Sequence, residues 1–115
     1  MSEMVFPWPD SRLSPNKRID RRALIGVKQV ARNEAFYIAK QGAAIVLDTD
    51  LQLTLTFCPP DKRKRDLDNL YASFKAYQDG MMDLLGVDDC KIERVILQRG
   101  NIVEDGIVIV DIREA

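Results

Sequence analysis

The segment of the sequence with the clearest chemical potential is Lys62-Arg-Lys-Arg-Asp66-Leu-Asp68-Asn69, in which four consecutive cations precede two aspartates. Side chains at positions i and i+2 point the same way on extended backbone, whereas on a helix they lie about 200° apart. If the chain is still extended here, Asp66 and Asp68 converge, and Leu67 between them points into the core. Two converging carboxylates are hard oxygen ligands that suit Mg²⁺, with Mn²⁺ as an alternative.

The same aspartates also have a simpler structural interpretation. Asp and Asn often precede a helix as N-caps, and Asp68 or Asn69 can have that role alone. The adjoining cations favour the metal site, because phosphodiester cleavage needs cations to hold the DNA backbone and a metal to activate water. A second pair, Asp88-Asp89, follows about twenty residues later. A solvated turn is its simpler interpretation.

The net charge of −1 conceals a strong segregation of charge along the chain. Taken alone, 17 Lys and Arg against 18 Asp and Glu argue against a nucleic-acid partner. However, residues 12–40 carry eight basic and two acidic side chains, and residues 66–89 carry six aspartates and one lysine. This pattern predicts a positive binding face beside a carboxylate site. The expected DNA contacts form two tracks: Lys62, Arg63, Lys64 and Arg65, and Asn16, Lys17 and Arg18.

Several classes of function are excluded by the composition. The chain has no histidine, which rules out histidine triads, histidine zinc sites and histidine proton shuttles. Cys58 and Cys90 lack Cys-x-x-Cys spacing and predict reduced thiols in an intracellular protein. The N-terminus does not resemble a signal peptide, and the apolar runs are too short to span a bilayer. We therefore expect a cytoplasmic protein that uses neither a membrane nor a small-molecule cofactor.

The periodicity of apolar residues predicts one α+β domain over residues 1–115, with two helices packed on a small mixed or antiparallel β-sheet. Expected helices cover residues 22–40 and 69–84, the second followed by Gly86 as a stop. Expected strands cover residues 4–8, 51–57, 92–98 and 106–112, the last two joined by a Gly100-Asn101 turn. The apolar run 43–47 is ambiguous between helix and strand.

At Asp66-Leu-Asp68-Asn69, the acidic motif, the sequence resembles the RusA-type Holliday junction resolvases of bacteria and their phages. The matching block is Pro60-Asp-Lys-Arg-Lys-Arg-Asp66-Leu-Asp68-Asn69-Leu70, followed by Asp88-Asp89. Phe6-Pro7-Trp8-Pro9 also looks like the opening strand of that family, and Ser11 and Asn16 like its following loop. The resemblance implies a homodimeric, Mg²⁺-dependent crossover junction endodeoxyribonuclease. Such an enzyme cuts four-way DNA by paired symmetric nicks in DNA recombination and repair.

The resemblance also implies roles for individual residues. Asp66, Asp68 and Asp89 match the three catalytic aspartates of the family, and Arg65 and its neighbours match its DNA-binding run. The family usually has a functional lysine three residues after the motif asparagine, where this chain has Ala72. Either Lys75, one helical turn further along, replaces that lysine as a catalytic residue, or the role is absent.

The length of the second expected helix limits how Asp89 reaches the other aspartates. A straight helix over residues 69–84 is about 24 Å long, and the segment 84–89 recovers at most roughly 17 Å. Two antiparallel copies of this helix in a dimer would bring Asp89 of one subunit beside Asp66 and Asp68 of the other. A break in the helix at Gly80 would instead let one chain close its own site.

Two further pairs of interpretations stay open at the level of sequence. Phe6 and Trp8 are either buried strand aromatics or stacking partners for DNA bases. Met81-Met82 belongs either to the core or to a dimer interface, and two symmetric nicks in a two-fold junction favour a dimer. The competing functions are a non-catalytic DNA-binding or junction-binding protein and a regulatory interaction module.

Overall fold

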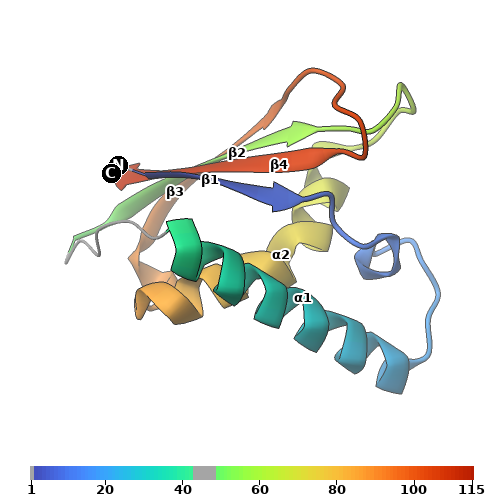
Figure 1. The fold of residues 1–115 in the computed structure, drawn as a ribbon, viewed down its shortest axis with the longest axis horizontal. Helices are drawn as coiled ribbons and strands as arrows, with labels where there is room; N and C mark the ends of the chain where they lie inside the picture. Colours follow the sequence, from blue (N-terminus) through green and yellow to red (C-terminus); the bar gives the residue numbers. More distant parts are fainter. Residues whose placement is uncertain (1, 43–48) are drawn as a thin grey trace.

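The computed structural model describes residues 2–42 and 49–115 of the chain and confirms the α+β architecture. Both helices cover one face of a four-stranded sheet, and no element of the described residues covers the other face (Figure 1). The apolar run 43–47 lies outside the described residues. The elements, in chain order, are β1 (Ser2–Pro7), η1 (Ser11–Leu13), α1 (Arg21–Gly42), β2 (Leu51–Cys58), α2 (Leu67–Leu85), η2 (Asp89–Lys91), β3 (Ile92–Arg99) and β4 (Ile107–Glu114).

The sheet is mixed, with the strand order β1-β4-β2-β3. Strand β4 pairs antiparallel with both β1 and β2, whereas β2 and β3 are parallel and are connected through α2. A direct turn between β3 and β4 was the wrong expectation, because β2 lies between them. Residues 100–106 instead pass the end of β2, where Gly100 N donates to Phe57 O and Val103 N donates to Pro59 O.

The core lies between the helices and the inner face of the sheet. Alternate residues of β2 point inward and are fully buried, as strict apolar alternation predicts. Three aromatic rings join the layers: Phe74 of α2 packs edge-on against Phe6 of β1 and Phe57 of β2. Phe6 is only 1% exposed, so it is a core residue and not a stacking partner for bases.

The two helices approach so closely that their backbones touch at Gly80. A Cβ atom on Gly80 would overlap the backbone carbonyl of Arg32 in α1. Helix α2 continues unbroken through Gly80, so this glycine serves close packing and the helix break allowed for at this position does not occur. Met81 and Met82 are also buried within the chain, which favours their interpretation as core residues.

Helix α2 begins earlier than its apolar pattern indicates. Its first residue is Leu67, two positions before the predicted start at Asn69, and it ends at Leu85. Gly86 follows with the left-handed backbone (φ 67°) that a helix C-terminus favours. Within residues 2–42 and 49–115, neither helix combines the length and the hydrophobicity needed to cross a membrane.

Candidate functional site

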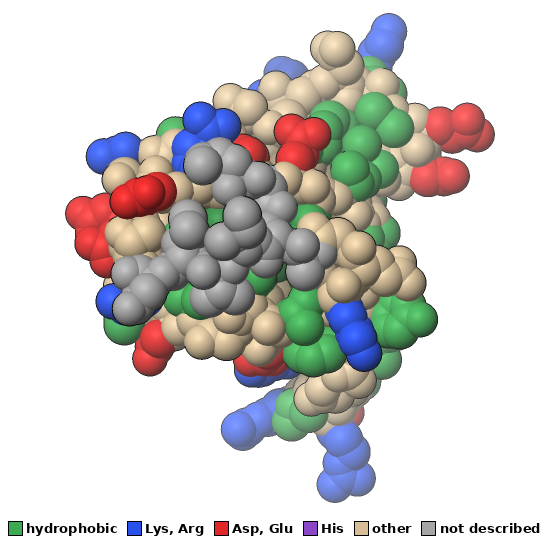
Figure 2. All heavy atoms as spheres, turned by 60° about the vertical axis from the view of Figure 1, so that its left-hand side comes forward, with side chains coloured by type: hydrophobic (Ala, Val, Ile, Leu, Met, Phe, Trp, Pro, Cys, Tyr) green, Lys and Arg blue, Asp and Glu red, His purple; other side chains and the backbone are tan. Residues whose placement is uncertain are grey.

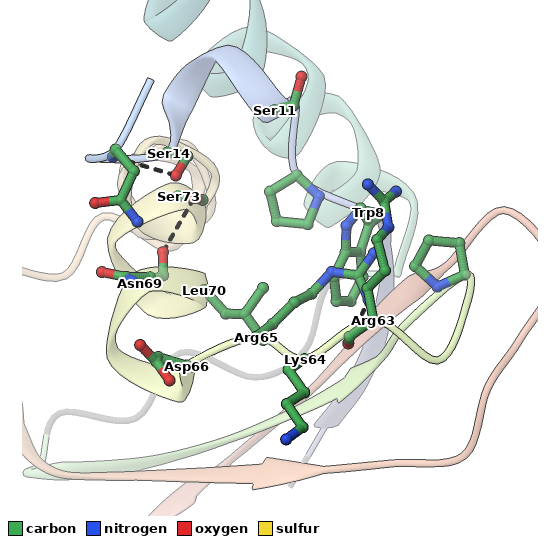
Figure 3. A pocket seen from close by; sticks show the side chains of 13 residues that line it. Trp8, Ser11, Ser14, Arg63, Lys64, Arg65, Asp66, Asn69, Leu70 and Ser73 are labelled. Atoms are coloured by element: carbon green, nitrogen blue, oxygen red, sulfur yellow. Dashed lines mark hydrogen bonds between the residues drawn. The ribbon is translucent and has the colours of Figure 1, made fainter. Parts of the chain in front are cut away.

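A cavity of about 490 Å³ separates the loop after β1 from the segment that leads into α2. The loop supplies Trp8 and Asn16, and the second segment supplies Arg63, Lys64 and Asp66. Figure 3 shows Asp66 on the side of α2, with Trp8 and Arg63 across the cavity from it. The structure thus brings part of each predicted DNA-binding track to the same hollow as one predicted catalytic aspartate.

The loop that forms one wall of the cavity is fixed to α2. The backbone N–H of Asp10 donates to the hydroxyl of Tyr77 at 3.1 Å, and Leu13 is buried beneath the loop. Asp10 also holds Arg12 in an ion pair at 2.7 Å, and the hydrogen bond from Arg12 lowers the pKa of this carboxyl. These contacts order the wall before any ligand arrives.

Arg65 forms part of the opposite wall, and its guanidinium points into the protein. It lies 5.4 Å from the centroid of the Trp8 ring and 2.9 Å from the carboxylate of Asp61. Arg99 donates to the backbone carbonyl of Arg65 at 2.7 Å. With its side chain only 18% exposed, Arg65 connects the basic run, which is the four cations from Lys62 to Arg65, to the core.

The other members of the basic run face solvent. The side chain of Arg63 is 79% exposed and forms an ion pair with Asp61 at 3.1 Å. The hydrogen bond from Arg63 is the main reason why the pKa of Asp61 lies well below its ordinary value. Lys62 and Lys64 are exposed, and Lys64 stands at the rim of the cavity (Figure 3).

Asp66 occupies the N-cap position of α2 without acting as a cap. Its backbone is extended (φ −84°, ψ 136°), but its side chain makes no capping hydrogen bond. Asp68 and Asn69 already belong to the helix, so the expectation that either of them is the N-cap is wrong. The Asp66 carboxylate is exposed and lines the cavity, where the N-terminal end of α2 favours its negative charge.

Asp66 and Asp68 do not lie on one extended segment that points both carboxylates the same way, although the sequence predicted that they would. That prediction required extended backbone through both residues, but α2 starts at Leu67, so Asp68 lies in the first helical turn. Both aspartates are exposed at the N-terminal end of α2, and Asp66 alone of the two lines the cavity. Leu67 packs against the core as predicted.

Asp88 and Asp89 lie beyond the other end of α2. The Asp88 side chain accepts a hydrogen bond from Cys90 N at 3.1 Å and caps η2, which supports its interpretation as a turn residue. Asp89 is the first residue of η2 and is exposed. The 19 residues of α2 span about 28 Å at 1.5 Å per residue, so the acidic motif and Asp89 belong to opposite ends of one helix.

The donor chemistry at the N-terminal end of α2 fits a hard divalent cation in part. Asp66 and Asp68 supply two carboxylates, and Mg²⁺ in proteins is commonly held by one or two carboxylates together with substrate phosphates and water. Among residues 2–42 and 49–115, three or more acidic or cysteine side chains do not gather at one point of a single chain. Asp89 therefore joins Asp66 and Asp68 only if it comes from a second chain.

Lys75 does not line the cavity of Asp66. It borders a separate hollow between α1 and α2, together with Ala72 and Asp79. Its ammonium lies 5.9 Å from the centroid of the Tyr71 ring. Lys75 shares a helix face with Asp68, seven residues away, which corresponds to about 10 Å along the axis.

Further neutral polar residues of the cavity were not predicted as site residues from the sequence. Asn69, Ser14 and Ser73 all line it, and Ser73 Oγ donates to the backbone carbonyl of Asn69 at 3.0 Å. Their residue types alone are weak evidence of a binding site, because small polar residues in loops and at the starts of helices usually form turns and caps. Of the second basic track, Asn16 lines the cavity, whereas Lys17 and Arg18 are exposed on the loop next to it.

Charges of both signs occur together on one face of the molecule. On the face drawn in Figure 2, acidic and basic side chains are interspersed with apolar and neutral ones. At the other end of α2, Arg32 forms an ion pair with Asp83, with a second contact at 2.8 Å. The hydrogen bond from Arg32 lowers the pKa of Asp83. Of the six aspartates in residues 66–89, Asp83 is thus held in an ion pair and Asp88 caps η2.

Comparison with known proteins adds a relative but no activity. No family model matches the chain. An uncharacterized protein of Xylella fastidiosa (strain Temecula1) is 39% identical over 94 residues, which cover 77% of this chain and 61% of the relative. The chain thus spans less than two thirds of the length of the relative that it matches.

Proposed function

We propose that this protein is a Mg²⁺-dependent, structure-specific endodeoxyribonuclease that resolves four-way (Holliday) DNA junctions by paired symmetric nicks, as RusA-type resolvases do. The observation that carries the proposal is the position of Asp66. Its carboxylate has no capping role and lines one cavity with Arg63 and Lys64. An exposed carboxylate beside exposed cations suits metal-dependent phosphodiester hydrolysis, in which the carboxylate holds the metal and the cations hold the DNA backbone.

The residues have separate tasks in this proposal. Arg63 and Lys64 hold a backbone phosphate at the rim, and Lys62, Lys17 and Arg18 extend the contact along the DNA. Asp66 and Asp68 hold the metal at the end of α2. A bound Mg²⁺ supplies an acidified water and stabilises charge on the leaving oxygen. Since the chain has no histidine, phosphate or solvent takes up the proton of the attacking water.

The protein acts as a homodimer in this proposal, with each centre built from two chains. The length of α2 supports it, because about 28 Å of helix lies between the acidic motif and Leu85, and Asp89 follows four residues beyond that end. Two copies of α2 packed antiparallel place Asp89 of one subunit beside Asp66 and Asp68 of the other. A two-fold dimer also matches a two-fold junction that must be nicked symmetrically. Lys75, on the face of Asp68, is the candidate for the missing family lysine.

The proposed activity belongs to DNA recombination and repair in the cytoplasm of a bacterial or phage-infected cell. The test incubates the purified protein with a labelled four-way junction, with and without Mg²⁺. We expect paired symmetric nicks that require the metal and disappear in Asp66→Asn. Asp50→Asn, an exposed aspartate that precedes β2, is the matched control and retains cleavage.

Two results would contradict the proposal. Salt-sensitive binding of the junction without cleavage in any divalent metal would identify a non-catalytic DNA-binding or junction-binding protein. Absent or salt-insensitive binding would leave a regulatory interaction module.

A further inference from the structure

We propose that the cavity beside Asp66 binds one unpaired nucleotide of the DNA substrate. The inference rests on the proposed function and deepens it, because it names the feature of a junction that the site recognises. Pockets of about 300–1,000 Å³ commonly hold small ligands, and this one has about 490 Å³. A base within a stacked duplex cannot enter such a hollow, whereas a base released from its stack can.

The apolar part of the lining suits the flat face of a base. Trp8, Pro9 and Pro60 line the cavity on the side away from α2. Trp8 is supported from behind, because Phe57 packs edge-on against it at 6.2 Å and Gly106 leaves no room for a side chain beneath it. Arg65, whose side chain is only 18% exposed, packs over the Trp8 ring and stiffens this wall from the protein side.

The polar part of the lining suits the edge of a base. Asn16 and Asn69 reach the cavity from the loop and from the first turn of α2, and each brings a carboxamide with donors and an acceptor. Within the described part of the chain, neither carboxamide has a hydrogen-bonding partner. Such groups read base edges by paired hydrogen bonds. Ser14 also lines the cavity, and its hydroxyl accepts a hydrogen bond from the backbone N–H of Asn16 at 3.4 Å.

The charged part of the lining suits the phosphate of the same nucleotide. Lys64 is exposed at the rim and Arg63 is 79% exposed, so its ion pair with Asp61 is open to exchange for a phosphate. Asp66 lies on the same rim. A nucleotide seated with its base in the cavity therefore has its phosphate beside the carboxylate that the proposed cleavage uses.

The walls of the cavity are held in place by contacts within the protein before a ligand binds. Tyr77 fixes the loop wall through Asp10, and Asp61, Trp8 and Arg99 fix the wall that contains Arg65. Preformed walls reduce the ordering cost of binding. Selection for an unpaired nucleotide would also make the site specific for DNA structure, because linear duplex offers no base that is free to enter.

The test uses Trp8, the single tryptophan of the chain, as a reporter inside the cavity. The full-length protein in EDTA, where no cleavage occurs, is titrated with a single-stranded oligonucleotide, the matched duplex and a deoxynucleoside monophosphate. We expect a saturable change of Trp8 fluorescence with the single strand at an affinity about tenfold above that for duplex, the effect of one stacked base. A weaker change with the monophosphate shows that one nucleotide suffices.

Two variants separate this cavity from general DNA affinity. Ser14→Phe fills the hollow and is expected to abolish the fluorescence change and the preference for single strand. The control Thr54→Phe, on the open face of the sheet, retains both. Asn69→Ala keeps the space but removes one carboxamide, and is expected to weaken binding of the single strand about fivefold. Circular dichroism and thermal melting check that each variant is folded.

The proposal is overturned if single strand and duplex bind equally and Trp8 fluorescence does not change. It is equally overturned if Ser14→Phe, shown to be folded, behaves as the wild type does. Neither result depends on cleavage. A protein without nuclease activity that passes this test would disprove the proposed function alone, and an active nuclease that fails it would disprove the cavity alone.

Discussion

The guanidinium of Arg65 lies over the ring of Trp8, 5.4 Å from its centroid, and connects the basic run to the loop that follows β1. Because the Arg65 side chain is only 18% exposed, this cation–π contact is partly removed from water and is stronger than one at the surface. The four consecutive cations of the motif therefore have unequal roles. Arg65 holds the segment in place, and the others face solvent.

Arg65→Ala is expected to lower the free energy of unfolding by about 1–2 kcal/mol, through the lost cation–π contact and the lost hydrogen bonds of its guanidinium. Lys62→Ala, at an exposed position of the same run, serves as the control and leaves stability unchanged. Urea denaturation followed by circular dichroism measures both. Equal effects of the two substitutions would show that Arg65 does not anchor the run.

Two glycines in the helices should respond in opposite ways to alanine. Gly80→Ala drives a methyl group into the backbone of α1 at Arg32 and should destabilise the protein by about 1–3 kcal/mol, as overpacking does. Gly26→Ala meets nothing within 4 Å and should stabilise by about 0.5–1 kcal/mol through helix propensity. Thermal unfolding of the pair tests the close approach of the helices. A stabilising Gly80→Ala would refute it.

Acid should weaken the contact between Asp61 and Arg63. The pKa of Asp61 is lower in the folded protein than its ordinary value of 3.8, chiefly because Arg63 donates a hydrogen bond to it. A lowered pKa gives a stabilising effect that is present above the unfolded value and is lost as the pH falls toward the folded one. Asp61→Asn should therefore lower the melting temperature by a constant amount above about pH 5 and by progressively less below about pH 4.

The control for this experiment is Glu104→Gln, an exposed carboxylate on the connection between β3 and β4. Its melting temperature should follow that of the wild type across the same range. A deficit of Asp61→Asn that stays constant down to pH 2.5 would mean that the carboxylate charge contributes nothing.

Mixed dimers test whether each centre uses two chains. Asp66→Asn and Asp89→Asn should each inactivate the homodimer. In a heterodimer of the two variants, a composite arrangement leaves one centre with Asp66 of one chain and Asp89 of the other, and so with both intact carboxylates. We expect this heterodimer, purified through two different tags, to nick one strand of a junction without completing resolution. A heterodimer that makes no nicks would show that each chain builds its own centre.

The predictable parts of the fold are those set by local periodicity. The alternation of β2 and the apolar stripes of the helices fixed their positions to within a few residues. The pairing of the sheet was not predictable, because nothing local in residues 107–114 indicates that β4 enters between β1 and β2. Pairing depends on contacts between distant segments, which periodicity within each strand does not encode.

The site was predictable in its residue types and less so in its geometry. The carboxylate Asp66 and the cations Arg63 and Lys64 do meet at one cavity. The inward direction of Arg65 depends on Trp8, nearly sixty positions away, and four identical charges in a row gave no reason to single it out. The start of α2 at Leu67 was missed because α2 includes Asp68 in its first turn, where the negative charge is favourable.

The backbone contact at Gly80 has a mechanical consequence for α2. The direct contact restricts sliding of α2 along α1, because a residue with a side chain in the place of Gly80 would clash with the Arg32 backbone. The two ends of α2, at Leu67 and Leu85, are about 28 Å apart. This distance equals about eight base-pair steps of 3.4 Å in B-form DNA. Adding one helical turn to α2 would increase the distance between its ends by about 5.4 Å.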